Sequence, residues 1–341
     1  MKKPFSLMKL LGLLLILMFA WILSLSVGSS DISAIDSIKL VCAKIPVVGQ
    51  FIDISEYSPS YLTIIWKVRF PRICLSSMVG AGLALAGCAY QGIFQNPLSD
   101  PYILGASSGA ALFATVAVVS GLSFKFLGLG TIGIFAFIGA VVTIILVYFI
   151  SRIGGEISMT NMLLSGTAIS TMLSAVISLI LIFNRDQMSK VYMWTMGSFT
   201  AATWEKVLFE LIFLVVATAV LMLFCDKLNV LLLGEEEAGS MGINVKNTHI
   251  IVILTASLLV ASSVAVSGII GFVGLIIPHS VRLVTGSDNK KVMPYSAAVG
   301  AIFLVICDTL ARTIVMPSEI PIGIITAICG APYFIFLVCK K

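Results

Sequence analysis

Residues 69–105 of this chain read RFPRICLSSMVGAGLALAGCAYQGIFQNPLSDPYILG. Two arginines, Arg69 and Arg72, precede an apolar run of the length that crosses a lipid bilayer, and a polar turn with two prolines ends it. Inside the run, glycine and alanine recur at the spacing that lets helix backbones approach one another closely in lipid. The stretch therefore predicts a membrane-spanning helix, Ile73–Ile93, at the centre of a helical bundle.

The composition predicts that membrane crossings make up most of the chain. Of its 341 residues, 59% are hydrophobic and only 11% are charged, whereas about a quarter of a soluble domain is charged. The net charge of +5 is modest and gives no indication of a nucleic-acid partner. Apolar segments in lipid must satisfy their own backbone hydrogen bonds, which favours helices. We expect ten spans: Leu10–Val27, Ile73–Ile93, Ile103–Gly121, Phe126–Ile150, Met162–Phe183, Val207–Phe224, Ile250–Val266, Ile269–Val284, Tyr295–Ile314 and Ile320–Val338.

The same pattern predicts a single all-α transmembrane domain over residues 1–341. The first span follows Lys2, Lys3 and Lys9, yet its apolar core is longer than the ~7–15 residues typical of a secretory signal. We therefore interpret it as an uncleaved helix. Lysines at both ends of the chain and at Lys290-Lys291 favour cytoplasmic termini under the positive-inside rule, which predicts a multi-pass protein of the cytoplasmic membrane.

Residues 226–249 form the largest polar segment on the expected cytoplasmic side. Three leucines there precede a glycine and three acids, and acids are stabilised in the first turn of a helix. An apolar knob with an acidic rim is typical of a surface that binds another protein; the alternative is leucines that dip back into lipid. The expected contact residues are Leu231, Leu232, Leu233, Gly234, Glu235, Glu236, Glu237, Ala238, Met241 and Gly242.

One charge lies inside an expected span. An ionised side chain at mid-bilayer costs roughly 2.5–3.5 kcal/mol on insertion scales and usually marks a function or an internal pair. Asp308 is such a residue, and Arg312 follows it on the same helix face, so the spacing makes an Asp308–Arg312 ion pair available.

Three arginines, Arg69, Arg72 and Arg312, are expected at the outer face, where the positive-inside rule gives no reason for them. Their partners are either internal acids, with Glu56 and Glu319 nearby in sequence, or carboxylates of an external protein, which the planar fork of arginine suits.

No motif for catalysis or nucleotide binding occurs. The dipeptide Gly-Lys is absent, so there is no Walker A loop, and the glycines of Gly268–Gly274 indicate close helix packing instead. The seven cysteines are scattered without metal-ligand spacing. We expect no catalytic residue, no metal site and no cofactor on this chain, which is not predicted to be an enzyme.

Three sets of residues, in order along the chain, resemble the FecCD-type permease subunits of ABC importers for iron-siderophores, haem and cobalamin. They are Arg69-x-Pro71-Arg72 with Gly87-x3-Gln91-x4-Asn96-Pro97-Leu98-x2-Pro101-x2-Leu104-Gly105-x3-Gly109-Ala110, then Gly268-x2-Gly271-Phe272-Val273-Gly274-Leu275-x2-Pro278-His279-x2-Arg282, then Pro321-x-Gly323-x2-Thr326-x3-Gly330-x-Pro332-x-Phe334. Together they extend from Arg69 almost to the end of the chain.

The resemblance implies a BtuC-like type II importer permease with ten transmembrane helices, working as a homodimer in the inner membrane of a prokaryote. It implies two cytoplasmic ATPase subunits, which carry the ATP and Mg, docked on the 226–249 loop. It also implies an extracellular or periplasmic binding protein whose acids meet Arg69, Arg72 and Arg312. The family's inner gate would fall near Asn96, Leu98, Met159 and Thr160.

The function expected from this resemblance is import of an iron chelate, a siderophore or haem, with a cobalamin importer as the alternative. An ion-coupled secondary transporter would need several embedded carboxylates, and only Asp308 and Glu210 qualify. A membrane prenyl transferase would need paired aspartate motifs or a His/Cys cluster, and the sequence has neither.

Overall fold

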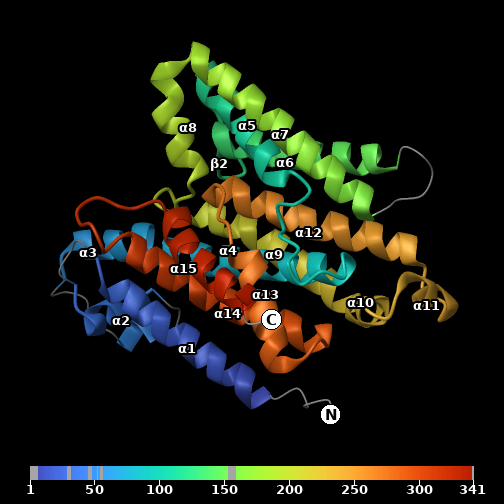
Figure 1. The fold of residues 1–341 in the computed structure, drawn as a ribbon. Helices are drawn as coiled ribbons and strands as arrows, with labels where there is room; N and C mark the ends of the chain where they lie inside the picture. The colour runs from blue at the N-terminus through green and yellow to red at the C-terminus, as the bar shows by residue number, and fades with distance from the viewer. Residues whose placement is uncertain are drawn as a thin grey trace.

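The computed structural model describes residues 7–28, 32–44, 48–51, 53, 57–152 and 159–339, most of them helical (Figure 1). The first half of the chain contains α1 Leu7–Ser26, α2 Ala34–Cys42, the 3-10 helix η1 Val48–Phe51, α3 Pro59–Thr63, the π-helix η2 Ile64–Arg69, α4 Phe70–Ile93, α5 Ala106–Ser120, strands β1 Lys125–Phe126 and β2 Leu129–Gly130, and α6 Thr131–Ser151. The second half contains α7 Met159–Phe183, the 3-10 helix η3 Arg185–Gln187, α8 Met188–Thr195, α9 Trp204–Leu223, α10 Cys225–Leu231, α11 Glu235–Ser240, α12 Val245–Ser267, α13 Val273–Thr285, α14 Asn289–Ala311 and α15 Ile322–Cys339.

Helix α4 lies at the centre of the bundle, as its small residues predict. It continues α3 and η2 without a break and packs against α9, α12, α13 and α14. A side chain at Gly80 would overlap the backbone of Gly300 in α14, and one at Gly87 would overlap Gly274 in α13. Glycine at these positions therefore permits the closest helix contacts of the core.

All ten expected spans are helical, but they differ in length. Seven helices of the described residues are long and apolar enough to cross a membrane: α1, α4 with the two elements before it, α6, α7, α9, α12 and α14. The other three spans are shorter apolar helices, Ala106–Ser120, Val273–Thr285 and Ile322–Phe336.

Four helices begin later than the apolar pattern indicates, and the delay is largest for α6 and α13. Residues 125–130 form a small antiparallel hairpin, β1 with β2, so α6 begins at Thr131 and not at Phe126. Helix α12 ends at Ser267, because Gly268 adopts a positive φ of 73° against the backbone of Trp194, and α13 begins only at Val273. Both turns are apolar, so hydropathy alone could not separate them from the helices that follow.

The remaining helices surround the central ones (Figure 1). The hairpin of α5 and α6 forms one side with α7 and α8, and α1 with α2 lies on the opposite side, where α1 packs against α14. Helices α10 and α11 lie at one end of the bundle, and α2 and α3 lie at the other end.

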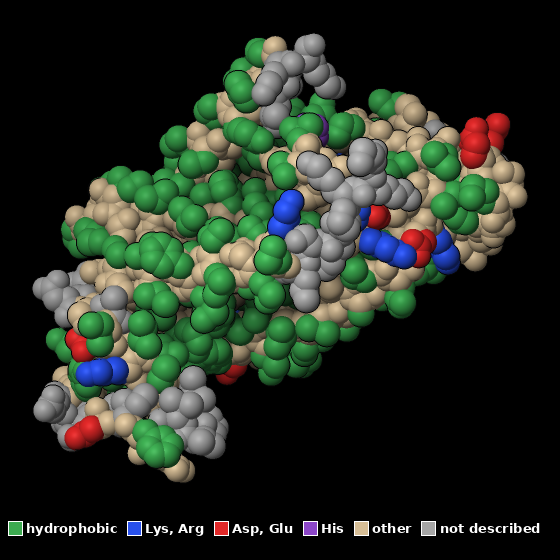
Figure 2. Space-filling model, turned by 90° about the horizontal axis from the view of Figure 1, so that it is seen from below, with side chains coloured by type: hydrophobic (Ala, Val, Ile, Leu, Met, Phe, Trp, Pro, Cys, Tyr) green, Lys and Arg blue, Asp and Glu red, His purple; other side chains and the backbone are tan. Residues whose placement is uncertain are grey.

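The outer surface of the bundle is largely apolar. Figure 2 shows hydrophobic side chains over most of one face, with the charged side chains gathered mainly toward its two ends. Large apolar side chains such as Leu15 of α1, 67% exposed, and Phe183 of α7, 79% exposed, have no protein cover. Such flanks suit lipid rather than water as the surrounding medium.

Candidate functional site

The end of the bundle formed by α10 and α11 carries the surface that the sequence predicts for a protein partner. Leu231 is fully buried, and the Gln95 side chain donates to its carbonyl oxygen over 2.7 Å. Leu232 and Leu233 are 36% and 65% exposed. Leu231 is therefore part of the core and supports the surface, whereas the next two leucines are open to contact.

Helix α11 supplies the acidic part of the same surface. It begins at Glu235, so its first turn holds all three acids, Glu235 to Glu237, at the positive end of the helix. These acids are exposed, Ala238 is buried, and Met241 is 63% exposed just after the helix. We call the exposed set Leu232, Leu233, Met241 and Glu235–Glu237 the α10–α11 surface.

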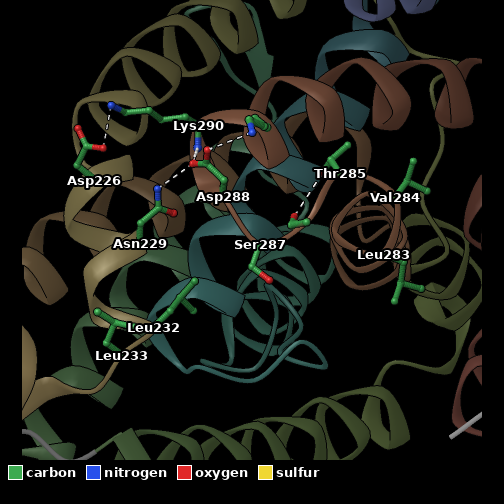
Figure 3. Close-up of a pocket in the computed structure, with 12 residues that line it drawn as sticks. Asp226, Asn229, Leu232, Leu233, Leu283, Val284, Thr285, Ser287, Asp288 and Lys290 are labelled. Carbon is green, nitrogen blue, oxygen red and sulfur yellow. Dashed lines mark hydrogen bonds and ion pairs between the residues drawn. The ribbon is translucent and has the colours of Figure 1, made fainter. Parts of the chain in front are cut away.

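A cavity of about 860 Å³ opens beside the α10–α11 surface (Figure 3). Leu232 and Leu233 line it from the end of α10, and Leu283 and Val284 line it from the end of α13. Leu283 and Val284 are 64% and 72% exposed. The cavity therefore presents apolar side chains from two elements to anything that approaches this end of the bundle.

Polar bonds tie α10 to the start of α14 across this cavity (Figure 3). Asn229 donates to Asp288 Oδ1 over 2.9 Å and accepts from the backbone N–H of Asn289 over 2.7 Å. Lys290 pairs with Asp226 at 2.8 Å. Neither Asn229 nor Asp288 belongs to a motif of the sequence, although aspartate directly before a helix is an N-cap signal, and Asp288 caps α14.

The residues expected at an inner gate lie in two elements. Asn96 and Leu98 are in the loop after α4, where the Leu98 N–H donates to Asn96 Oδ1 over 2.9 Å. Met159 and Thr160 form the first turn of α7, directly after residues 153–158, which lie outside the described part of the chain. Their role in a pathway stays a prediction.

A buried charge network lies away from the α10–α11 surface, where α4 begins and α14 ends. Arg72 donates to both oxygens of Asp308, from Nε to Oδ2 over 3.0 Å and from Nη2 to Oδ1 over 2.9 Å. Its third nitrogen, Nη1, donates to Glu319 over 2.9 Å, and Thr200 donates to the other Glu319 oxygen over 3.0 Å. The forked geometry is the strongest form of a charge-assisted hydrogen bond.

The expected Asp308–Arg312 pair does not form. Arg312 ends α14 with its side chain directed to α1, where Nη2 donates to the Ser24 hydroxyl over 2.8 Å and to the Ser24 carbonyl oxygen. Asp308 is 1% exposed and accepts hydrogen bonds from Arg72 of the neighbouring helix instead. Helical spacing made Arg312 a candidate, but a guanidinium from another helix presents both donors to the carboxylate at once.

The three arginines expected at the outer face are close enough to act on one another electrostatically. All three are less than 10% exposed as whole residues, and Arg69 donates to the carbonyl oxygen of Leu25. Glu319, one of the two internal acids considered from the sequence, is a partner of Arg72. Glu56, the other, lies outside the described residues. Whether the cluster also meets an external carboxylate stays a prediction.

The described residues form a helical bundle with apolar flanks, and several of its helices are long and apolar enough to cross a membrane. Residues 16–340 match the model of the FecCD transport family. The chain belongs to this family, which consists of ABC transporter permeases and not of enzymes. The ion-coupled transporter and the membrane enzyme considered from the sequence do not fit a member of it.

Relatives of this chain are described with different substrates. The cobalamin import permease BtuC of Halobacterium salinarum is 42% identical over 274 residues, 80% of this chain and 73% of its own length. The Fe(3+)-citrate import permease YfmD of Bacillus subtilis is 38% identical over 327 residues, 96% of this chain and 93% of its own. An inward-facing structure of a transporter classed as metal-chelate type matches 98% of this chain and 100% of its own, with a TM-score of 0.83 and 34% identity.

Proposed function

We propose that this chain is the permease subunit of an ATP-driven importer that takes up an iron chelate, a siderophore or haem, delivered by an external binding protein. Two copies form the pathway, each with ten crossings and both termini in the cytoplasm. The observation that carries the iron assignment is the ferric-citrate permease relative, whose similarity extends over 96% of this chain.

The α10–α11 surface is the proposed docking site for the cytoplasmic ATPase. Exposed leucines beside a cavity give a partner an apolar anchor, and the acids Glu235 to Glu237 give it a charged rim. Such a centre and rim are the usual anatomy of a protein interface. The bonds from Asn229 to Asp288 and Asn289 then offer a direct route by which movement at α10 reaches the membrane helix α14.

The arginine cluster at the other end of the bundle is the proposed contact for the binding protein. Arg69, Arg72 and Arg312 gather there, and Glu319, with its side chain 36% exposed, is the more accessible of the two acids that hold Arg72. A carboxylate of the binding protein would replace solvent beside this cluster. Changes to buried, hydrogen-bonded charges at an interface mainly affect the dissociation rate.

Asn96, Leu98, Met159 and Thr160 are the proposed inner gate. This proposal follows the family resemblance and the position of these residues at the ends of α4 and α7. ATP and Mg belong to the partner ATPase in this scheme, and the chain itself makes and breaks no covalent bond.

Cobalamin is the second candidate substrate, favoured by the 42% identity to the cobalamin permease. Uptake by vesicles that contain the permease, its ATPase and its binding protein separates the two. We expect ATP-dependent accumulation of a ferric chelate, with labelled cobalamin left outside. Accumulation of cobalamin without any ferric chelate would replace the iron assignment by the alternative.

A further inference from the structure

A second cavity, of about 450 Å³, lies between the segment around the β1–β2 hairpin, the loop after α8, the start of α9 and the end of α12. Its volume falls within the range of small-molecule sites. It does not include the α10–α11 surface, the gate residues or the three arginines.

Three hydrogen-bond donors line this cavity without a partner in the described part of the chain. They are the Lys206 ammonium, the Ser123 hydroxyl and the Trp194 indole N–H. Among the described residues that line it, none is an aspartate or a glutamate. The cavity thus offers donors and a positive charge, with no acid of its own to neutralise them.

The surroundings leave the charge of Lys206 uncompensated. Glu205, next to it in sequence, pairs with Lys125 and not with Lys206, and the described residues that line the cavity include no acid that could pair with Lys206. Lys206 is itself only partly exposed. A partly buried ammonium without a counter-charge is unfavourable, and an anion in the cavity would remove that cost.

A chain of hydroxyls connects the cavity wall to the arginine cluster. Ser198 and Thr200 both line the cavity and lie 2.7 Å apart, oxygen to oxygen. Thr200 donates onward to Glu319, which pairs with Arg72. An anion bound at Lys206 would therefore lie beside the groups proposed to meet the binding protein.

We propose that this cavity binds a small carboxylate-bearing anion, held by Lys206 with Ser123 and Trp194 as further donors. A carboxylate accepts several hydrogen bonds at once, which matches three donors around one space. That the anion is the incoming iron chelate rests on the proposed function, whereas binding of a carboxylate at Lys206 does not.

The test uses the full-length permease purified in detergent, without ATPase or binding protein, so that its outcome is independent of transport. Radiolabelled citrate and ferric citrate are the probes, and equilibrium binding is measured at low salt. Loss of a charge-assisted hydrogen bond predicts an affinity about tenfold or more lower in Lys206→Met. Lys206→Arg should retain binding. Lys190→Met is the matched control, because it removes an equal charge from exposed α8 without touching the cavity.

Melting temperatures without citrate show whether the variants fold, and Ser123→Ala provides a milder variant expected to weaken binding if Lys206→Met does not fold. Binding of ferric citrate but not of citrate would identify the chelate as the ligand, and binding of both probes would identify the carboxylate group. Either result supports the site if Lys206→Met loses affinity and Lys190→Met does not. Absence of binding to the natural chain, unchanged affinity in Lys206→Met, or an equal loss in Lys190→Met would each overturn it.

Discussion

At the residue scale, Arg72 determines how the buried charges are arranged. It pairs with Asp308, 236 residues away in sequence, and with Glu319. The sequence placed Asp308 inside a span, with Arg312 as an available ion-pair partner. Asp308 is buried, but its ion-pair partner is Arg72. The sequence could not predict Arg72 as the partner of Asp308, because the two residues lie in different helices. Helix packing, and not local spacing, brings them together.

The Arg72–Asp308 pair should control the stability of the end of the bundle where α4 begins and α14 ends. Removal of one partner leaves the other buried and unpaired, so Asp308→Asn or Arg72→Gln should each lower the free energy of unfolding by on the order of 3–5 kcal/mol. The double variant should lose clearly less than the sum of the two, measured by unfolding in detergent.

The double variant Arg312→Gln with Asp308→Asn is the control for this comparison of single and double variants. Arg312 is near Asp308 but bonds to Ser24, so its effect should be close to additive with that of Asp308→Asn. A stronger coupling of Asp308 to Arg312 than to Arg72 would contradict the network described above.

The Glu319–Arg72 pair should make the stability of the fold depend on pH. Burial alone would raise the pKa of the Glu319 carboxyl, but the hydrogen bond and charge of Arg72 outweigh it and hold that pKa below its usual value. The pair therefore stabilises the fold above the ordinary glutamate pKa of about 4.3, and this contribution is lost as the pH falls through the lowered value. Melting temperatures from pH 6 down to about 3 should fall less steeply in Glu319→Gln than in the natural chain. Parallel pH profiles would show that the pair contributes nothing.

At the element scale, hydrophobic periodicity and the spacing of small residues were sufficient to predict the central position of α4 and the existence of all ten apolar helices. The same signals could not separate helix from turn around Leu127 or Gly268, because both turns are apolar and each contains a residue with a positive φ. The three acids after Gly234 did predict the start of α11, since the helix terminus itself favours them.

The role of the α10–α11 surface as a docking site can be tested with substitutions that leave the buried core unchanged. Leu232→Asp with Leu233→Asp places charge on exposed positions, so the chain should remain folded and inserted while it loses its ATPase during co-purification. Truncation of central apolar contacts at an interface commonly lowers affinity by about tenfold or more. Leu127→Asp, on the equally exposed hairpin turn, is the matched control and should co-purify normally. Normal ATPase recovery with the double variant would exclude this surface as the docking site.

At the scale of the whole molecule, the chain is a bundle with lipid-suited flanks and two different ends. One end presents the exposed leucines and acids of the α10–α11 surface, and the other holds the arginine cluster with the cavity at Lys206 beside it. Length, hydropathy and the three motif sets predicted the class and the family. The cavity at Lys206 escaped the sequence analysis, because four separate segments form it and no motif joins them.

The central claim is that transport through this chain is driven by ATP on a separate subunit. Proteoliposomes that contain the permease, its ATPase and its binding protein measure it directly through uptake of a radiolabelled ferric chelate. We expect accumulation that requires ATP, both partner proteins and an intact α10–α11 surface, and that continues when ionophores collapse all ion gradients. Accumulation driven by an ion gradient alone, without ATP or the ATPase, would contradict it.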